Sequence, residues 1–162
     1  IMKRQKFGRL CFASSGVGVT GMDGLSAYAS SKGAIEALAR CLRLECAGTG
    51  VSVHLLHPPL TRTDSSSPLP VPPQMMAEPE KVGRALARRI ESNSFIITTG
   101  IRQRLMVGLA YHLPGRVGRL MSMATKRAQE NSKSAAAKPA AERRAKAKPA
   151  ASKAKQSRYA DM

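Results

Sequence analysis

SAYASSKGA, residues 26–34, is the stretch from which the rest of the chain can be interpreted. Tyr28 and Lys32 stand four positions apart in it and would project side by side from one face of a helix. An ammonium group held beside a phenol favours the phenolate, so Tyr28 becomes a candidate general acid and base. The same spacing also arises by chance, as a half-buried tyrosine beside a solvated lysine, and the flanking segments must discriminate between these interpretations.

The segments around this stretch predict an alternation of strands and helices. GRLCFA at 8–13 is a short apolar run that leads into Ser14-Ser15-Gly16 as a strand leads into a turn. A helical pattern follows over 25–46, and VSVHLL at 51–56 is an apolar run of the kind buried in a parallel sheet. The helix is predicted to turn an apolar stripe inward, made of Ile35, Leu38, Ala39, Leu42 and Leu44.

This order resembles the short-chain dehydrogenase/reductase family, whose motif set is a strand ending in Ser-Ser, a tyrosine thirteen residues on and a lysine four beyond it. Ser15, and not its neighbour Ser14, has that spacing to Tyr28. The resemblance implies that Ser15 donates a hydrogen bond to the substrate oxygen, that Tyr28 passes the proton, and that Lys32 holds the nicotinamide ribose and favours the phenolate. It implies hydride transfer between NAD or NADP and a carbonyl or alcohol substrate.

The segment HPPLTRT at 57–63 is similar to the family's Pro-Gly-x-Val-x-Thr segment, which lies against the nicotinamide carboxamide. The resemblance therefore implies that Pro58, Thr61 and Thr63 contact the cofactor. Pro59 stands where the family has glycine and Thr61 where it has valine, so the loop loses flexibility and one backbone N–H.

The remaining pattern of the first hundred residues predicts a partial doubly wound α/β sheet of the Rossmann type. A proline-rich loop covers 60–79, a helix is predicted over 80–91 and a strand over 94–99. The resemblance implies that this loop caps the substrate pocket, and the alternative is a plain surface loop. We expect residues 1–100 to be the C-terminal half of a larger domain.

A glycine-rich phosphate-binding loop between a strand and a helix does not occur in the sequence, and neither does an acidic residue placed to take a ribose hydroxyl. We therefore expect this chain by itself to be inactive and truncated. The residues that choose between NAD and NADP would lie in the missing half.

Residues 101–130 predict two basic amphipathic helices, the second starting at Pro114. Such helices suit an anionic membrane surface or a partner subunit, including a second copy of the chain; the alternative is a helix pair packed on the sheet. Apolar positions are Leu105, Met106, Leu109, Leu113, Val117, Leu120, Met121 and Ala124. The polar side is lined by Arg102, Arg104, Arg116, Arg119, Lys126 and Arg127.

The segment 131–162 is rich in lysine, alanine and proline, and nine basic residues against two acidic ones give it +7 of the chain's net charge of +17. This composition predicts a disordered tail. It could hold nucleic acid through phosphate contacts, or it could be a solvated appendage. The alternative to an oxidoreductase is thus a non-catalytic remnant that binds nucleic acid or an anionic membrane through its basic helices and tail.

The cysteines and histidines indicate neither disulfides nor a metal site. The odd number of cysteines, placed in predicted strand and helix, suggests reduced and buried thiols, and the histidines are scattered among apolar residues. We expect neither a leader sequence nor a segment that spans a bilayer, since no apolar run is long enough, and we therefore expect a cytoplasmic protein that could lie peripherally on a membrane. These residues are Cys11, Cys41, Cys46, His54, His57 and His112.

Overall fold

The structure is a computed structural model that describes residues 1–66, 69, 71, 73–131 and 133–134. Most of the predicted tail at 131–162 therefore lies outside the described residues. The chain divides into two compact units, Ile1–Thr125 and Lys126–Met162. The first unit contains all the strands and named helices described below.

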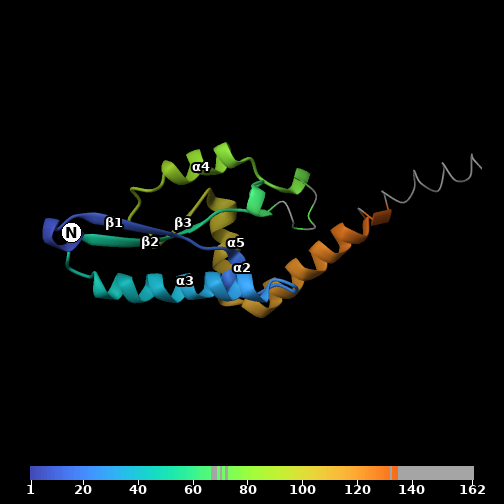
Figure 1. Cartoon of the computed structure of the whole chain (residues 1–162), viewed down its shortest axis with the longest axis horizontal. Helices are drawn as coiled ribbons and strands as arrows, with labels where there is room; N and C mark the ends of the chain where they lie inside the picture. Colours follow the sequence, from blue (N-terminus) through green and yellow to red (C-terminus); the bar gives the residue numbers. More distant parts are fainter. Residues whose placement is uncertain (67–68, 70, 72, 132, 135–162) are drawn as a thin grey trace, which may run out of the picture. The chain divides into compact units, whose positions relative to one another are not determined.

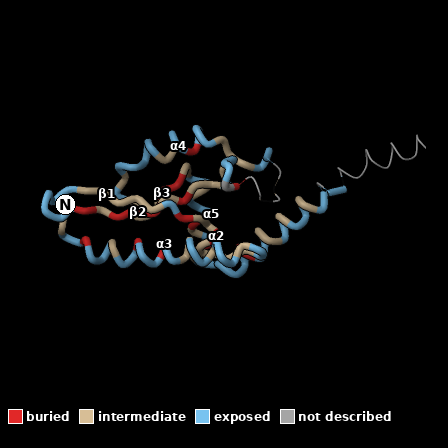
Figure 2. Tube along the Cα trace, viewed as in Figure 1, coloured by how far each residue is buried: buried red, intermediate tan, exposed pale blue. Residues whose placement is uncertain are grey.

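A parallel sheet with the strand order β1-β2-β3 forms the centre of the first unit (Figure 1). Its strands are β1 (Gly8–Ala13), β2 (Val51–His57) and β3 (Ile96–Thr98). Phe12 of β1 and Ile96 of β3 both pair with Leu55, so β2 is the central strand. Buried residues follow one another along β2, as expected for a parallel strand that is covered on both faces (Figure 2).

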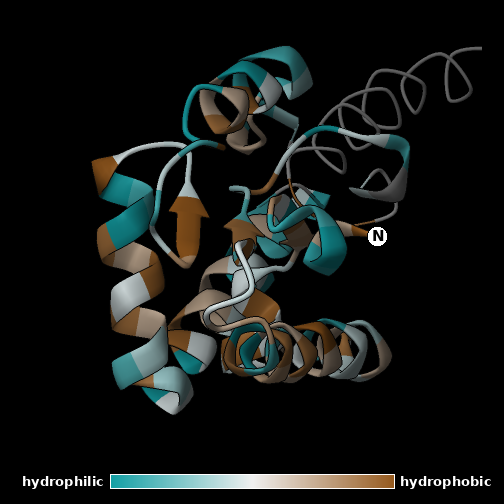
Figure 3. Ribbon diagram, turned by 90° about the vertical axis from the view of Figure 1, so that its left-hand side faces the viewer, coloured by the Kyte–Doolittle hydropathy of each residue, from teal (hydrophilic) through white to brown (hydrophobic). Residues whose placement is uncertain are grey.

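Helices cover both faces of the sheet, which confirms the predicted partial doubly wound α/β fold. α3 (Ser26–Glu45) lies on one face and α4 (Pro79–Ala87) on the other (Figures 1 and 3). α5 (Ile101–His112) follows β3, and a further helix over 114–131 begins at Pro114, as the sequence predicted. The short elements are α1 (Met2–Gln5), α2 (Gly16–Thr20), η1 (Asp64–Ser66) and η2 (Pro73–Met75).

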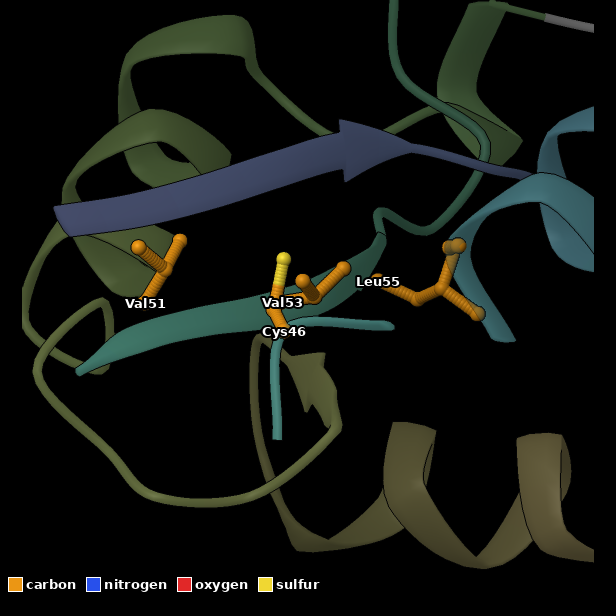
Figure 4. Close-up of a cluster of buried hydrophobic side chains, with 5 residues drawn as sticks. Cys46, Val51, Val53 and Leu55 are labelled. Carbon is orange, nitrogen blue, oxygen red and sulfur yellow. The ribbon is translucent and has the colours of Figure 1, made fainter. Parts of the chain in front are cut away.

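The core lies between β2 and α3. Side chains of Val51, Val53 and Leu55 gather there with Cys46, and Ala39 completes the buried cluster (Figure 4). Ala39 of α3 and Cys46, which caps the helix, are two turns apart and therefore lie on the same side of it, toward β2.

Two leucines of the predicted stripe are not buried. Leu38 is 49% exposed and Leu44 is 78% exposed. At about 100° per residue these positions lie about 100° and 140° away from Ala39. The buried face of the helix is therefore narrower than the predicted stripe. Cys41 lies on the same outer side and is exposed, contrary to the prediction of buried thiols, although all three cysteines are free.

The chain between α4 and β3 also differs from the prediction, since α4 ends at Ala87 and β3 starts only at Ile96. The reason is a guanidinium group from the edge strand. Arg9 donates from Nη1 to the carbonyl oxygens of Ile90 at 2.6 Å and Ser92 at 3.0 Å. These carbonyls are therefore satisfied outside helix or sheet geometry.

The leucines of α5 face solvent. In an amphipathic helix packed on the sheet they would face the sheet. Val107 and Ala110 are buried, whereas Leu105 and Leu109 are exposed together with the arginines. Within the part of the chain that the structure describes, no helix combines the length and the hydrophobicity that a membrane-crossing segment needs.

Candidate active site

The carboxyl ends of β1 and β2 lie together because the strands are parallel and in register. The backbone N–H of Ser14 extends the ladder by donating to the carbonyl oxygen of Leu56 at 2.9 Å. Ser15 on one strand end and Pro58 on the other therefore follow neighbouring positions at one edge of the sheet. In open α/β folds this edge is where ligands bind.

Ser15 occupies the N-cap of α2. Its Oγ lies 3.4 Å from the backbone N–H of Val17, from which it accepts, and its backbone is extended. Because the hydroxyl acts as an acceptor in this contact, its own hydrogen remains able to donate to another group. The residue is half-buried at the start of a short turn of helix.

Tyr28 and Lys32 lie side by side near the start of α3, as the four-residue spacing predicted. The Nζ atom of Lys32 is 5.7 Å from the centre of the Tyr28 ring, which is 45% exposed. The same Nζ donates to the carbonyl oxygen of Ala13 at 3.0 Å. Lys32 therefore connects the helix that carries the tyrosine with the strand end that carries Ser15.

Gly18 allows α2 to approach α3 at this point. A Cβ atom at Gly18 would lie 2.7 Å from the Cβ of Lys32 and 3.0 Å from the backbone nitrogen of Gly33. No side chain fits into that space, so the backbone of α2 packs directly against the helix segment that holds the lysine.

We expect Gly18→Ala to lower the free energy of unfolding by about 1–3 kcal/mol, because the added methyl must push the two helices apart. Gly16→Ala is the matched control in the same helix, since a Cβ there meets nothing within 4 Å. The control should change stability by no more than about 0.5 kcal/mol. Urea unfolding of both variants measures the difference, and equal midpoints would show that α2 and α3 are not tightly packed.

The predicted cofactor segment is folded onto itself. Thr61 donates from Oγ1 to the carbonyl oxygen of Pro59 at 2.8 Å and forms a β-bridge with Ala77. The Oγ of Ser66 accepts from the backbone N–H of Thr63 at 2.9 Å and lies 3.3 Å from its Oγ1. Both threonine hydroxyls are thus engaged inside the loop, and Pro58 is half-buried directly after β2.

Behind this edge lies a buried polar cluster that the sequence did not reveal. The carboxylate of Glu36, which is 3% exposed, accepts a short hydrogen bond from the hydroxyl of Ser14. It also lies 3.0 Å from Nε2 of His57 and accepts from the hydroxyl of Tyr111 at 2.5 Å. Arg40 approaches the second carboxylate oxygen at 3.0 Å. One side chain of α3 thereby joins the ends of β1 and β2 to α5.

The cluster stabilises Glu36 as a carboxylate. Burial acts to raise its pKa, but hydrogen bonds from His57, Ser14 and Tyr111 and the electrostatic attraction of His57 together lower the pKa from 4.5 to about 2. For Tyr111, burial raises the pKa above its ordinary value, and the hydrogen bond to Glu36 and its negative charge raise it further. At neutral pH the cluster therefore combines a charged carboxylate with a neutral phenol.

One sequence signal could have pointed to this cluster. Glu36 stands one turn after Lys32 and one turn before Arg40, on the face of the helix that also carries the fully buried Ala39. An acidic residue on a buried stripe requires hydrogen-bond donors from other elements, although the sequence does not say which. The spacing to Tyr28 selects Ser15 and gives its neighbour Ser14 no role, whereas the structure shows Ser14 buried and bonded to Glu36.

The other buried histidine belongs to the structural framework. His54 lies 2.8 Å from the carbonyl oxygen of Ser94 through Nδ1 and 3.1 Å from Arg9 through Nε2. It thereby ties β2 to the turn before β3. Among the described residues, no group of three or more histidine, cysteine or acidic side chains could hold a metal ion.

Known dehydrogenases and reductases resemble this chain in sequence. The family model for short chain dehydrogenase matches residues 1–71. The 3-ketodihydrosphingosine reductase of Mus musculus is 31% identical over 109 residues, which cover 61% of this chain and 33% of that protein. The chain thus spans about a third of the length of the curated relatives it matches.

Solved structures share the fold at low sequence identity. A 7beta-hydroxysteroid dehydrogenase matches with a TM-score of 0.56 and 24% identity, covering 74% of this chain and 49% of that one. A short chain dehydrogenase from Burkholderia cenocepacia J2315 in complex with NADP matches with a TM-score of 0.59 and 16% identity, covering 71% and 48%. These matches establish that the three strands and their helices are arranged as in those proteins.

Proposed function

Because the chain belongs to the short-chain dehydrogenase/reductase family, we propose that it carries the catalytic half of an NAD(P)-dependent oxidoreductase that interconverts a carbonyl and an alcohol. The observation that carries this proposal is the position of Lys32. Its ammonium group lies beside the ring of Tyr28 and is hydrogen-bonded to the strand end that leads into Ser15. These contacts support a common site for Ser15, Tyr28 and Lys32 at one edge of the sheet.

Each of these residues has a distinct role in the proposed reaction. Ser15 donates its free hydroxyl hydrogen to the substrate oxygen and orients it. Tyr28 gives its phenolic proton to that oxygen during reduction and takes the proton back during oxidation. Lys32 stabilises the phenolate left on Tyr28, since a positive charge near the ring favours the anion.

The residues present fit the nicotinamide end of the cofactor. An ammonium group has three hydrogens to donate, and Lys32 uses one of them on Ala13, so two remain for ribose hydroxyls. Tyr28, Pro58, Thr61 and Thr63 would complete the contacts at this end. When bound, the nicotinamide would supply or accept the hydride.

A long-chain ketone is the first substrate to test. The relative from Mus musculus is named 3-ketodihydrosphingosine reductase, and that name supports 3-ketodihydrosphingosine as the initial choice. The half-exposed ring of Tyr28 is compatible with a substrate that reaches the site from solvent.

We expect the isolated 162-residue chain to bind neither NADH nor NADPH with micromolar affinity, because it offers no glycine loop and helix N-terminus for the pyrophosphate. Isothermal titration of each cofactor into the chain measures this. Joining a phosphate-binding half of the family ahead of residues 1–162 should restore binding; we call this product the completed enzyme. Micromolar binding by the isolated chain would contradict the proposed truncation.

The alternative function is a non-catalytic protein that binds nucleic acid or anionic lipid through its basic residues. The clustering of exposed arginines on α5 and on the helix after it favours this alternative. It predicts that substitutions of Tyr28 leave the protein's function unchanged, whereas the oxidoreductase proposal predicts a large loss.

A further inference from the structure

The orientation of α5 is unusual for a helix on the surface of an α/β fold. Its buried positions are the small side chains Val107 and Ala110, which are 5% and 4% exposed. The large apolar side chains of α5 and of its C-cap residue face outward, with exposed fractions between 40% and 68%. They are Ile101, Leu105, Met106 and Leu109 of α5 and Leu113 at the C-cap. An ordinary surface helix buries its large apolar side chains and exposes polar ones.

This orientation is fixed by contacts on the inner side of the helix. The hydroxyl of Tyr111 donates to the buried Glu36 at 2.5 Å, and the guanidinium of Arg40 lies 5.4 Å from the centre of the Tyr111 ring. At about 100° per residue, Leu105 and Leu109 lie about 120° and 160° from Tyr111 around the helix. Turning the leucines inward would break the bond to Glu36, so their exposure is built into the fold.

The next helix repeats the pattern over residues 114–125. Val117 and Gly118 are buried, and a Cβ at Gly118 would lie 2.7 Å from the carbonyl oxygen of Thr20, so the backbone packs closely there. Leu120 and Met123, in contrast, are 61% and 53% exposed. The backbone N–H of Asp23 donates to the hydroxyl of Ser122 at 3.3 Å and ties this helix to the loop before α3.

The charge of α5 and of residues 114–125 has a single sign. No aspartate or glutamate occurs between residues 101 and 129. Three exposed arginines accompany the outward leucines and methionines: Arg102, Arg116 and Arg119. Arg104 is also exposed, but it lies about 20° from Tyr111 around the helix and therefore on the inner side. Hydrophobic and hydrophilic residues alternate along α5 in Figure 3, so charge and apolar surface are interspersed.

We propose that the outward side of α5 and of the helix over 114–125 is a docking surface for an anionic lipid bilayer. Leucine and methionine side chains would enter the boundary between headgroups and acyl chains, and the arginines would contact the lipid phosphates. This surface, which we call the α5 face, combines apolar and basic side chains. It consists of Ile101, Leu105, Met106, Leu109, Leu113, Leu120, Met123, Arg102, Arg116 and Arg119.

Charge favours the bilayer over a second copy of the chain. A symmetric dimer through the α5 face would bring the same arginines from both copies together, and the sequence there contains no acidic residue to pair with them. A negatively charged bilayer satisfies the arginines and the exposed apolar side chains at the same time. The proposal does not depend on the proposed catalysis, because docking requires neither Tyr28 nor a cofactor.

Co-sedimentation of the 162-residue chain with vesicles tests the proposal. One set of vesicles contains phosphatidylcholine alone and the other a mixture of phosphatidylcholine and phosphatidylserine. The matched variants are Leu105→Gln with Leu109→Gln on the α5 face, and Leu38→Gln with Leu44→Gln at equally exposed positions of α3. The basic tail is the same in every variant, so its attraction to the vesicles cancels in the comparison.

We expect the α5 pair to lower binding to the phosphatidylserine vesicles by about tenfold and the α3 pair to leave it unchanged. Arg116→Gln with Arg119→Gln should also weaken binding, and this effect should diminish as salt is added. Equal binding by the α5 pair and the unaltered chain would overturn the proposal. So would loss of a dimer in sedimentation equilibrium on substitution of the α5 pair, since a second copy would then be the occupant.

Discussion

Tyr28→Phe is expected to lower turnover of the completed enzyme by ~10²-fold or more while leaving its stability unchanged. The substitution removes the phenolic hydroxyl that we propose as the proton donor and keeps the ring. Because the ring of Tyr28 is 45% exposed, loss of the hydroxyl should cost little folding free energy. Steady-state reduction of 3-ketodihydrosphingosine by NADPH or NADH measures the change, together with thermal unfolding of the same samples.

Tyr111→Phe is the matched control for this experiment. Tyr111 also loses a hydroxyl, but that hydroxyl donates to the buried carboxylate of Glu36. We expect the control to lose about 1–3 kcal/mol of stability and to retain most of its turnover at a temperature where it is folded. Near-normal turnover by Tyr28→Phe would mean that another group supplies the proton.

Replacing Glu36 is expected to cause the largest loss of stability of any substitution considered for this fold. Glu36→Ala leaves the buried Ser14 and His57 and the partly buried Tyr111 without their common partner. Removing one partner from a buried charged network costs about 3–5 kcal/mol. Urea unfolding of the chain measures the loss, and Glu45→Gln at the exposed end of α3 should change stability by no more than about 0.5 kcal/mol.

Glu36 should also make the free energy of unfolding depend on pH in the acidic range. The pKa of Glu36 is lowered from 4.5 to about 2 in the folded protein, which corresponds to about 3 kcal/mol. Since the folded pKa is the lower one, this stability is present in full above pH 4.5 and is lost as the pH falls toward 2. Glu36→Gln should therefore show a flatter decline of its urea midpoint over that range. Parallel curves for the two proteins would show that Glu36 is not held as a carboxylate.

The fold could be predicted because its signals are local. Apolar runs at 8–13 and 51–56 and the helical pattern between them each lie within one segment, and parallel pairing follows from the helix that connects the strands. The closeness of Tyr28 and Lys32 was predictable for the same reason, since a spacing of four requires only one helix. The catalytic roles of Ser15, Tyr28 and Lys32 stay predictions. So do the cofactor contacts of Pro58, Thr61 and Thr63.

The Glu36 cluster was missed because it depends on tertiary structure. Its members come from α3, β2, α5 and the residue that follows β1, and 75 positions of sequence separate Glu36 from Tyr111. The spacing that selects Ser15 says nothing about where the neighbouring hydroxyl of Ser14 points. In α5, the repeat of leucines defines a face of the helix but not whether that face turns inward, and here the bond from Tyr111 decides it.

The central claim is that Ser15, Tyr28 and Lys32 act as one catalytic unit, and the turnover of a double variant tests it most directly. If the three residues act as a unit, Tyr28→Phe already abolishes the proton transfer that Ser15 assists. Adding Ser15→Ala should then lower turnover little further. We therefore expect Ser15→Ala with Tyr28→Phe to reduce 3-ketodihydrosphingosine at nearly the same residual rate as Tyr28→Phe alone in the completed enzyme. Losses that multiply across the two substitutions, or a double variant as active as the unaltered enzyme, would contradict the account.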